Sequence, residues 1–429
     1  MPVFAHLSRR AVLAFSLAAI ASLAGCAKGL DDEARVRFAN VTAAGISLDV
    51  YRDSNEVFDS AAAGSITDYK DVEHASNTWS LRTDGASSLL ASATLSLASK
   101  THYTMLGYGS EGNLQLQLLE ETNSTPSSGY AKLRVFNAAP DAGTLDVFVS
   151  DDAQDLSSAS TTVSSAAYGS ATSFVTIASG NQRLRVTASG DRSDLRLDLR
   201  QVTLSSQSIV TLVIAPGRGG VLVDALLLPE QSTASFLANT QARMRVANGL
   251  SANTSAALTW NGSTVTSSQR APSVGSYTLV NAGSATLEVG VGGATADTSA
   301  RTLSAGADYT VLLTGTSQAA AVNLITDDNR LPTSSTKSKI RLVNGLTGLS
   351  DTLSLSVDYE AVATGTQSGA ASGYATITPP SNGRIEIDAP TLSTPIYLNT
   401  DFTLSTQAVY SVFVLGDAGS PGTVIRKDR

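Results

Sequence analysis

Cysteine and histidine are almost absent from this sequence. Cys26 is the single cysteine among 429 residues, so no disulfide can form within the chain and hydrophobic cores must hold the fold together. After the first 26 residues the only histidines are His74 and His102. No His/Cys group has zinc-ligand spacing, and no Gly-x-Ser-x-Gly motif provides a serine nucleophile. We therefore expect no metal, no cofactor and no catalysis.

Charge and aromatic side chains are also sparse. Charged residues make up 15% of the chain, and the formal net charge is −8 without a basic patch, which argues against nucleic-acid binding. Aromatic residues make up only 6%, and we expect both tryptophans, Trp79 and Trp260, to lie in cores rather than on glycan-binding platforms. The acidic stretches Ser150–Asp152 and Asp327–Asn329 lack the alternating ligands of a calcium loop, so we interpret them as solvated loops.

The stretch Lys132–Val149 shows what the chain has in abundance. Leu133, Val135 and Asn137 fall on one face of a strand and Arg134 on the other, which predicts an inward apolar face and an arginine that points outward. The turn residues Pro140–Gly143 then lead into a second alternating strand. This pattern predicts a hairpin or Greek-key corner of a half-exposed antiparallel sheet.

The Arg-x-x-Asn pattern of this stretch occurs four times. The pairs are Arg37/Asn40, Arg134/Asn137, Arg245/Asn248 and Arg341/Asn344. The asparagine is always in phase with the inward residues. Because a buried amide without a partner is costly, we expect it to bond the backbone of the following loop. On the second strand, Asp49, Asp146 and Asp358 recur, with Thr259 at the corresponding place in the third copy. We interpret these aspartates as solvent-exposed.

A second landmark repeats in the same order. A leucine is followed six residues later by the start of an apolar strand, at Leu97/Tyr103, Leu204/Val210, Leu303/Tyr309 and Leu404/Tyr410. Order and spacing agree in all copies, which indicates one domain repeated four times. Short alternating strands with frequent turns predict an all-β fold of four tandem immunoglobulin-like, Greek-key β-sandwiches. Their expected ranges are residues 34–121, 130–230, 242–332 and 339–429.

The first residues form a targeting segment. Arg9 and Arg10 precede a short apolar run, and Leu23-Ala24-Gly25-Cys26 resembles the bacterial lipoprotein signal. The resemblance implies that the signal peptide 1–25 is removed, that Cys26 is lipidated, and that residues 26–33 form a leader. An ordinary signal peptide with an incidental cysteine is the alternative. Ala27 resembles the sorting pattern for the outer membrane of a Gram-negative host.

Residues 133–149 resemble the opening of the bacterial family called domain of unknown function 4397, whose members start with a similar Arg-Val…Pro-Asp-Ala…Asp-Val-Tyr line. The match is good in the second repeat, moderate in the first and weak in the other two. The resemblance implies a secreted or lipid-anchored β-sandwich and no particular reaction.

These observations favour a lipid-anchored cell-envelope protein that acts as a structural, adhesive or ligand-binding array. The expected partners are the membrane, through lipidated Cys26, and an envelope protein or polysaccharide. Two alternatives stay open. One is a periplasmic, chaperone-like assembly partner that uses exposed strand edges, and the other is a hydrolase with a site formed between domains.

Overall fold

The computed structural model describes residues 32–429 except residues 44 and 111. The expected signal and lipidation residues Leu23, Ala24, Gly25 and Cys26 lie outside this part of the chain. All the named elements of the described residues are β-strands. Among those residues, no helix has the length and apolarity needed to cross a membrane.

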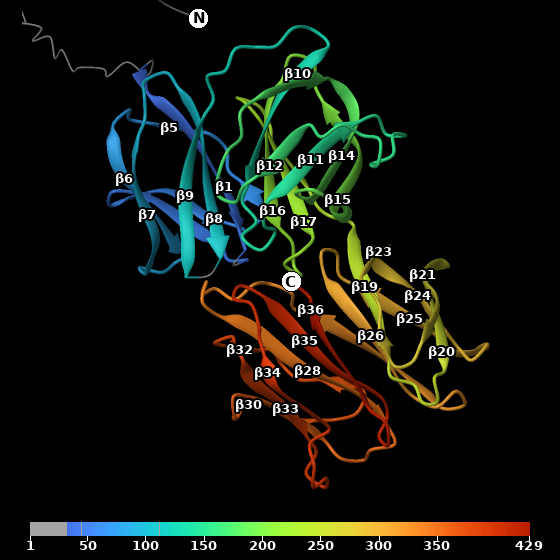
Figure 1. The fold of residues 1–429 in the computed structure, drawn as a ribbon. Coiled ribbons are helices and arrows are strands. Elements are labelled where there is room, and N and C mark those ends of the chain that lie inside the picture. Colours follow the sequence, from blue (N-terminus) through green and yellow to red (C-terminus); the bar gives the residue numbers. More distant parts are fainter. Residues whose placement is uncertain (1–31, 44, 111) are drawn as a thin grey trace, which may run out of the picture.

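The strands form four sandwiches, each built of two sheets, as the sequence predicted (Figure 1). We call the sheet that holds the first strand of a domain its first sheet, and the facing one its second sheet. In domain 1 the first sheet contains β1 (Ala34–Thr42), β4 (Ser65–Ile66), β5 (Lys70–Val72), β8 (His102–Ser110) and β9 (Asn113–Glu120). Its second sheet contains β2 (Leu48–Arg52), β3 (Asn55–Ala61), β6 (Ser76–Thr83) and β7 (Leu89–Ser96).

Domain 2 follows the same plan, except that one strand is added and the counterpart of β4 is reduced to an isolated bridge between Phe136 and Ala171. Its first sheet contains β10 (Tyr130–Asn137), β13 (Val175–Ala178), β16 (Ile209–Pro216), β17 (Val223–Pro229) and the additional β18 (Ser235–Leu237). Its second sheet contains β11 (Leu145–Ser150), β12 (Val163–Ala166), β14 (Gly180–Ala188) and β15 (Asp191–Leu204).

Domains 3 and 4 repeat the plan of domain 1. The first sheet of domain 3 contains β19 (Gln241–Asn248), β22 (Ser273–Val274), β23 (Thr278–Asn281), β26 (Asp308–Gly315) and β27 (Ala320–Asp327), and its second sheet contains β20 (Ser255–Trp260), β21 (Ser263–Arg270), β24 (Gly283–Val291) and β25 (Ala294–Leu303). The first sheet of domain 4 contains β28 (Ser338–Thr347), β31 (Ala370–Ala371), β32 (Ala375–Ile377), β35 (Val409–Asp417) and β36 (Gly422–Lys427), and its second sheet contains β29 (Leu353–Val357), β30 (Glu360–Thr366), β33 (Gly383–Asp388) and β34 (Tyr397–Phe402).

The stretch Lys132–Val149 crosses between sheets rather than forming a hairpin. β10 lies in the first sheet and β11 in the second, so Pro140–Gly143 makes the corner between them. The first sheet is also mixed, because β10 runs parallel to β16 with Lys132 opposite Ile209. The prediction of an antiparallel sheet was therefore wrong at this pairing, since alternation of side chains does not reveal strand direction.

The core of each domain lies between its two sheets. In domain 2, Leu133 and Val135 of β10 face Leu145 and Val147 of β11 in one buried cluster, as the alternation predicted. Trp79 and Trp260 are 0% and 2% exposed, which confirms their predicted core positions. The Nε1 of Trp260 also donates a hydrogen bond of 2.8 Å to the carbonyl of Asn281.

The outward faces of the first sheets are buried as well, because the domains pack in pairs (Figure 1). A cluster between domains 1 and 2 contains Ala39, Val41, Leu106, Tyr108, Leu119, Phe136, Ala138, Val213, Ala215, Leu226 and Leu228. A cluster between domains 3 and 4 contains Ala247, Val274, Leu312, Val343, Phe413 and Leu415. The sheets predicted to be half exposed are therefore covered on both faces. Phe136 lies on the same strand face as Arg134, and an aromatic residue there is the sequence feature that indicates a covered face.

Backbones of domains 3 and 4 approach each other at two glycines. A Cβ atom on Gly249 would lie 2.2 Å from the carbonyl oxygen of Gly345. A Cβ atom on Gly345 would lie 2.5 Å from Leu415 and 2.9 Å from Leu312, and both leucines belong to the cluster between the domains. Glycine is required at position 249, because a side chain there would meet the backbone of the other domain. At Gly345 a side chain would meet the ends of two leucine side chains, of which Leu312 belongs to domain 3.

Candidate functional site

The arginine of each Arg-x-x-Asn pattern lies between paired domains. Arg37, Arg245 and Arg341 are only 2–3% exposed, and Arg134 is partly buried. The prediction that this arginine points into solvent was wrong. It does point away from its own core, but the neighbouring domain covers the face on which it lies.

Each arginine has two contacts that recur in all four domains. Its Nε donates a hydrogen bond to a hydroxyl on the parallel neighbour strand, with distances of 2.7, 2.8, 2.9 and 2.9 Å to Thr104, Thr211, Thr310 and Ser411. Its guanidinium also lies over an aromatic ring, at 4.7, 4.7, 4.4 and 4.6 Å from the centroids of Tyr69, Phe174, Tyr277 and Tyr374. The face of an aromatic ring attracts a cation, so these rings stabilise the charged guanidinium groups above them.

A carboxylate at the end of the last strand, or one residue after it, completes this arrangement in domains 1, 3 and 4. The hydroxyls of Thr104, Thr310 and Ser411 donate to Glu121, Asp327 and Asp428 at 2.5, 2.6 and 2.6 Å. In domain 2 the corresponding acid, Glu230, accepts hydrogen bonds from Asn123 instead. We call the arginine, hydroxyl, aromatic ring and acid of one domain its arginine cluster.

The arginine clusters connect the domains of a pair. Arg245 of domain 3 forms an ion pair with Asp428 of domain 4, and Arg341 of domain 4 forms the reciprocal pair with Asp327 of domain 3. Between domains 1 and 2, Arg37 pairs with Glu121 of its own domain and donates to the carbonyls of Pro229 and Ser232 at 2.8 and 2.6 Å. Buried ion pairs of this kind hold the two domains in one relative orientation, because any other orientation would leave a buried charge without its partner, which is strongly unfavourable.

The acidic stretch Asp327–Asn329 belongs to this interface and is not a solvated loop. Asp327 and Asn329 are 1% and 0% exposed. The hydroxyl of Tyr277 donates a 2.6 Å hydrogen bond to Asp327. Burial and the nearby charge of Asp327 raise the pKa of Tyr277 well above its ordinary value. Tyr69 is similar, with its pKa raised by burial and by its hydrogen bond to Glu121.

The asparagine of each Arg-x-x-Asn pattern behaves as predicted. The Nδ2 atoms of Asn40, Asn137 and Asn248 each donate to two backbone carbonyls, among them Ile46, Gly143 and Thr254 of the following loops. Asn344 donates to the carbonyl of Thr366. In each domain the Oδ1 atom also accepts a backbone N–H two residues further on. These bonds confirm the structural interpretation and fix the corner between the two sheets.

Two of the three recurrent aspartates are buried rather than exposed. Asp49 and Asp146 are 3% and 9% exposed. Asp49 accepts backbone N–H bonds of 2.9 and 3.0 Å from Ser60 and Gly85, and Asp146 accepts the equivalent bonds from Ser165 and Gly190. They hold two neighbouring loops. The prediction of solvated aspartates was wrong because these loops fold back over the strand.

The register also corrects the assignment of Asp358 and Thr259 to this position. Leu48, Leu145, Ala256 and Leu353 occupy equivalent places at the start of the second strand. The residues that correspond to Asp49 are therefore Ala257 and Ser354. Asp358 lies in the turn after β29, and its Oδ1 accepts the N–H of Arg384 at 2.7 Å.

An acidic group in domain 1 has the spacing of cation ligands. Carboxylate oxygens of Asp49, Asp59 and Asp84 can lie within 4.8 Å of one another. Both oxygens of Asp49 already accept backbone hydrogen bonds, and the other two side chains are exposed. The loop geometry accounts for this group without a metal ion.

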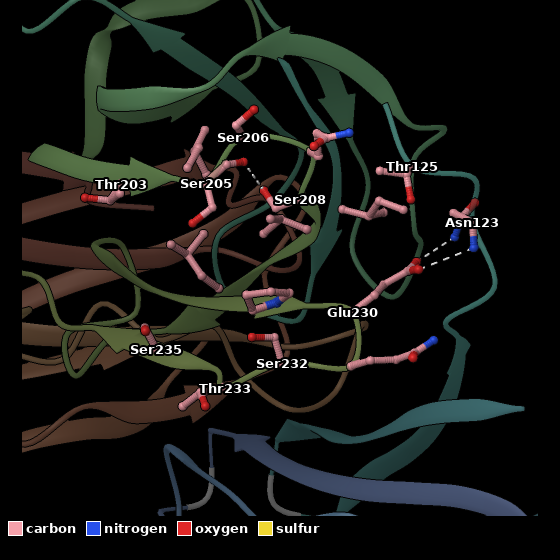
Figure 2. Close-up of a pocket in the computed structure, with 17 residues that line it drawn as sticks. Asn123, Thr125, Thr203, Ser205, Ser206, Ser208, Glu230, Ser232, Thr233 and Ser235 are labelled. Atoms are coloured by element: carbon pink, nitrogen blue, oxygen red, sulfur yellow. Dashed lines mark hydrogen bonds between the residues drawn. The ribbon is translucent and has the colours of Figure 1, made fainter. Parts of the chain in front are cut away.

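A polar pocket of about 560 Å³ opens beside the contact between domains 1 and 2 (Figure 2). Its wall combines the linker residues Asn123 and Thr125 with the loop of residues 205–208 and the segment of residues 229–235. Asn123 donates a 2.6 Å hydrogen bond to Glu230, whose pKa is raised by burial. None of the residues that line the pocket is aromatic, and Glu230 is the only titratable one. The pocket therefore offers hydroxyl and amide contacts without a paired acid and base.

Two solved structures are distantly similar to this chain. One is a carbohydrate-binding module of family CBM26 from Eubacterium rectale, in complex with maltoheptaose, with 11% identity over 47% of this chain and 98% of that chain and a TM-score of 0.16. Another is the Bacillus anthracis TIE protein, with 9% identity over 87% of this chain and 66% of that chain and a TM-score of 0.14. TM-scores this low support no argument about this chain. No curated protein matches the sequence.

The family comparison agrees with the repeated arrangement described above. The family model matches residues 34–148 and 242–351. Each match begins at the first strand of an odd-numbered domain and continues into the next domain. Together the two segments cover just over half of the sequence, and the chain belongs to the family described as Domain of unknown function (DUF4397).

Proposed function

We propose that this chain is a lipid-anchored cell-envelope protein whose four sandwiches form a rigid, non-catalytic scaffold for structural, adhesive or ligand-binding work. The arginine clusters are the observation that carries this proposal. The ion pairs Arg245–Asp428 and Arg341–Asp327, both buried, bridge the domains of one pair in both directions. A chain of independent binding modules would not need buried charges to fix the angle between its domains.

The anchor in this proposal rests on the sequence Leu23-Ala24-Gly25-Cys26. Several acyl chains on one cysteine hold a protein firmly at a membrane, because each buried CH₂ contributes about 0.8 kcal/mol. With Cys26 lipidated and the first strand starting at Ala34, only a short leader separates domain 1 from the membrane. We assign the protein to the outer membrane. The experiment below decides whether it faces the cell surface or the periplasm.

A second candidate is an assembly partner that binds other envelope proteins through strand edges. One observation favours it. The segment between domains 2 and 3 supplies β18, which pairs with the edge of β17 at Ala225, Leu226 and Leu227. This edge therefore accepts an added strand, which is the chemistry of β-augmentation.

Localisation of the wild type and Cys26→Ser tests the proposal, with Ala21→Ser as a matched control outside the Leu-Ala-Gly-Cys motif. We expect wild type and Ala21→Ser in the membrane fraction and Cys26→Ser in the soluble fraction. Equal behaviour of all three would refute the anchor. Protease treatment of whole cells then separates the functions, since a surface scaffold is cleaved, whereas a protected protein that crosslinks to one specific envelope protein supports the assembly partner.

A further inference from the structure

Domain 2 has a loop that the other domains lack. Its second and third strands, β11 and β12, are joined by residues 151–162, whereas residues 53–54, 261–262 and 358–359 make the same connection in domains 1, 3 and 4. A two-residue turn is enough to join these strands. The longer loop of domain 2 is therefore not needed by the fold.

The same domain carries arginines on the outward face of its second sheet. On β14, Arg183 and Arg185 occupy pleat positions that hold Thr78 and Ser80 in domain 1 and Thr286 and Glu288 in domain 3. In domain 4 these positions hold Arg384 and Glu386. Arg192 and Arg200 of β15 add two more guanidinium groups to domain 2.

The loop lies over these arginines. Arg192 donates to the carbonyls of Leu156, Ser157 and Ala159, and its guanidinium is 5.0 Å from the ring centroid of Phe148 beneath it. Arg183 and Arg200 both donate to the carbonyl of Asp152, at 3.4 and 3.2 Å.

The charges of the loop complement those of the sheet. The carboxylate of Asp152 accepts a 3.0 Å hydrogen bond from Arg200. The pKa of Arg183 is raised chiefly by the hydrogen bonds that its guanidinium donates to Asp198 of β15, and the charges of Asp152 and Asp155 in the loop add to the rise. Arg183 already has a carboxylate partner on the sheet, Asp198, so the loop neutralises chiefly Arg200 and covers the other arginines with backbone carbonyls.

Arg185 is the least satisfied of the four arginines. It is 1% exposed, and its one hydrogen bond goes from Nη2 to the Ser150 hydroxyl at 2.7 Å. Its Nε has no partner, and Oδ1 of Asp152 is a second buried polar atom without one. Burial and the charge of Arg183 lower the pKa of Arg185. A buried guanidinium without a carboxylate is unfavourable unless an anion can reach it.

We propose that this face of domain 2 binds an oxyanion of the phosphate class through Arg183, Arg185 and Arg200, and that residues 151–162 form an acidic lid which the ligand displaces. The guanidinium fork matches the geometry of a phosphate, and in the absence of a ligand the lid supplies Asp152 to Arg200 in its place. The site does not depend on the anchor, because it is formed by domain 2 alone.

Calorimetric titration of the full chain with inorganic phosphate tests the proposal. Replacing residues 151–162 with Asn-Gly, a sequence that favours the short turn of the other domains, exposes the arginines. We expect phosphate to bind about tenfold more tightly to this short-loop variant, and Arg185→Gln in the same background to reverse the gain, since a hydrogen bond to a charged group contributes about that factor. The milder double variant Asp152→Asn with Asp155→Asn should shift the affinity in the same direction as the short loop.

Arg270→Gln provides the matched control, because Arg270 is an exposed arginine in domain 3. We expect it to leave phosphate binding unchanged. Circular dichroism shows whether each variant is folded, and Arg200→Gln replaces Arg185→Gln if the latter unfolds. Phosphate affinity that changes with neither the loop nor these arginines would overturn the proposal.

Vesicles then identify the source of the oxyanion. The short-loop variant, combined with Cys26→Ser to exclude acyl anchoring, is mixed with phosphatidylglycerol or phosphatidylcholine vesicles. Arginine-dependent binding to the anionic vesicles assigns a lipid headgroup. Phosphate binding without vesicle binding assigns a soluble or polymer-borne oxyanion.

Discussion

Arg245 forms an ion pair with Asp428, a residue 183 positions further along the chain and in another domain. Both side chains are almost fully buried, at 3% and 1% exposure. The contact is possible only when domains 3 and 4 lie face to face, so the folding of the two domains and their association are coupled.

Asp327→Asn should destabilise the pair formed by domains 3 and 4. The change leaves Arg341 buried without its carboxylate, which is expected to cost about 3–5 kcal/mol. Trp79→Phe makes Trp260 of domain 3 the only tryptophan, so urea unfolding can be followed in this pair alone. Asp297→Asn, at the partly exposed Arg301–Asp297 pair of domain 3, is the control and should change stability by less than about 1 kcal/mol. A similarly small effect of Asp327→Asn would contradict the role of the arginine clusters.

Gly249→Ala should separate domains 3 and 4 without changing any charge. The new methyl group would lie 2.2 Å from the backbone oxygen of Gly345, and a backbone cannot rotate away as a side chain can. We expect a loss of about 1–3 kcal/mol, the usual range for overpacking. Gly373→Ala is the control, because a Cβ atom there meets nothing within 4 Å. Equal unfolding midpoints of the two variants, again by Trp260 fluorescence, would show that the close approach is not required.

Asp328 should make the linker after domain 3 sensitive to acid. Burial opposes its ionisation, but hydrogen bonds and charges from Arg330 and Lys339 prevail and lower its pKa from 3.8 to about 2. A carboxyl group whose pKa is lower in the folded than in the unfolded protein stabilises the folded state at every pH above its pKa in the unfolded chain. This contribution is lost as the pH falls towards about 2. Asp328→Asn should therefore be less stable than wild type at neutral pH and equal to it at the acid end of a urea series. A constant difference at every pH would exclude this ion pair as the cause.

Asp141 should have the opposite pH dependence. Burial raises its pKa above 3.8, although the N–H of Leu331 donates to it at 2.7 Å. A raised pKa means that the charged form is unfavourable in the folded protein, so this penalty is complete above the folded pKa and vanishes below the unfolded value. Asp141→Asn keeps the acceptor for Leu331 and should be more stable than wild type at neutral pH but not at pH 3. Lower stability at neutral pH would show that the charge itself holds the linker.

The contacts of side chains that face the core of their own domain could be predicted from the sequence. The contacts of side chains on the outer faces of the sheets could not. Asn137 and Val135 lie in phase along one strand, and the chemistry of a buried amide is sufficient to predict what Asn137 bonds. Arg134 is different, because its surroundings depend on a neighbouring domain, and the apolar alternation along its strand does not reveal that domain. Phe136 was the available signal, since a phenylalanine on a solvent-facing strand surface is unexpected.

The aspartates and the parallel strands were missed for related reasons. The burial of Asp49 depends on loops that return to it from Ser60 and Gly85, and these contacts leave no period in the sequence. Alternation likewise cannot distinguish the parallel pairing of β10 with β16 from an antiparallel one. The arginine-rich run of β14 and β15 was visible in the sequence, but the cover over it became evident only when the loop of residues 151–162 was placed.

The strand registers also determine how far the molecule can extend. In domain 1 the start of β1 and the end of β9 both lie beside the start of β8, since Arg35 is opposite His102 and Glu120 is opposite Tyr103. The chain therefore leaves the domain at the end where it entered. Domains connected in this way turn back on themselves instead of continuing in a line. The two domains of a pair lie side by side, so a pair adds width rather than length. The length of the whole molecule is therefore closer to two domain lengths than to four.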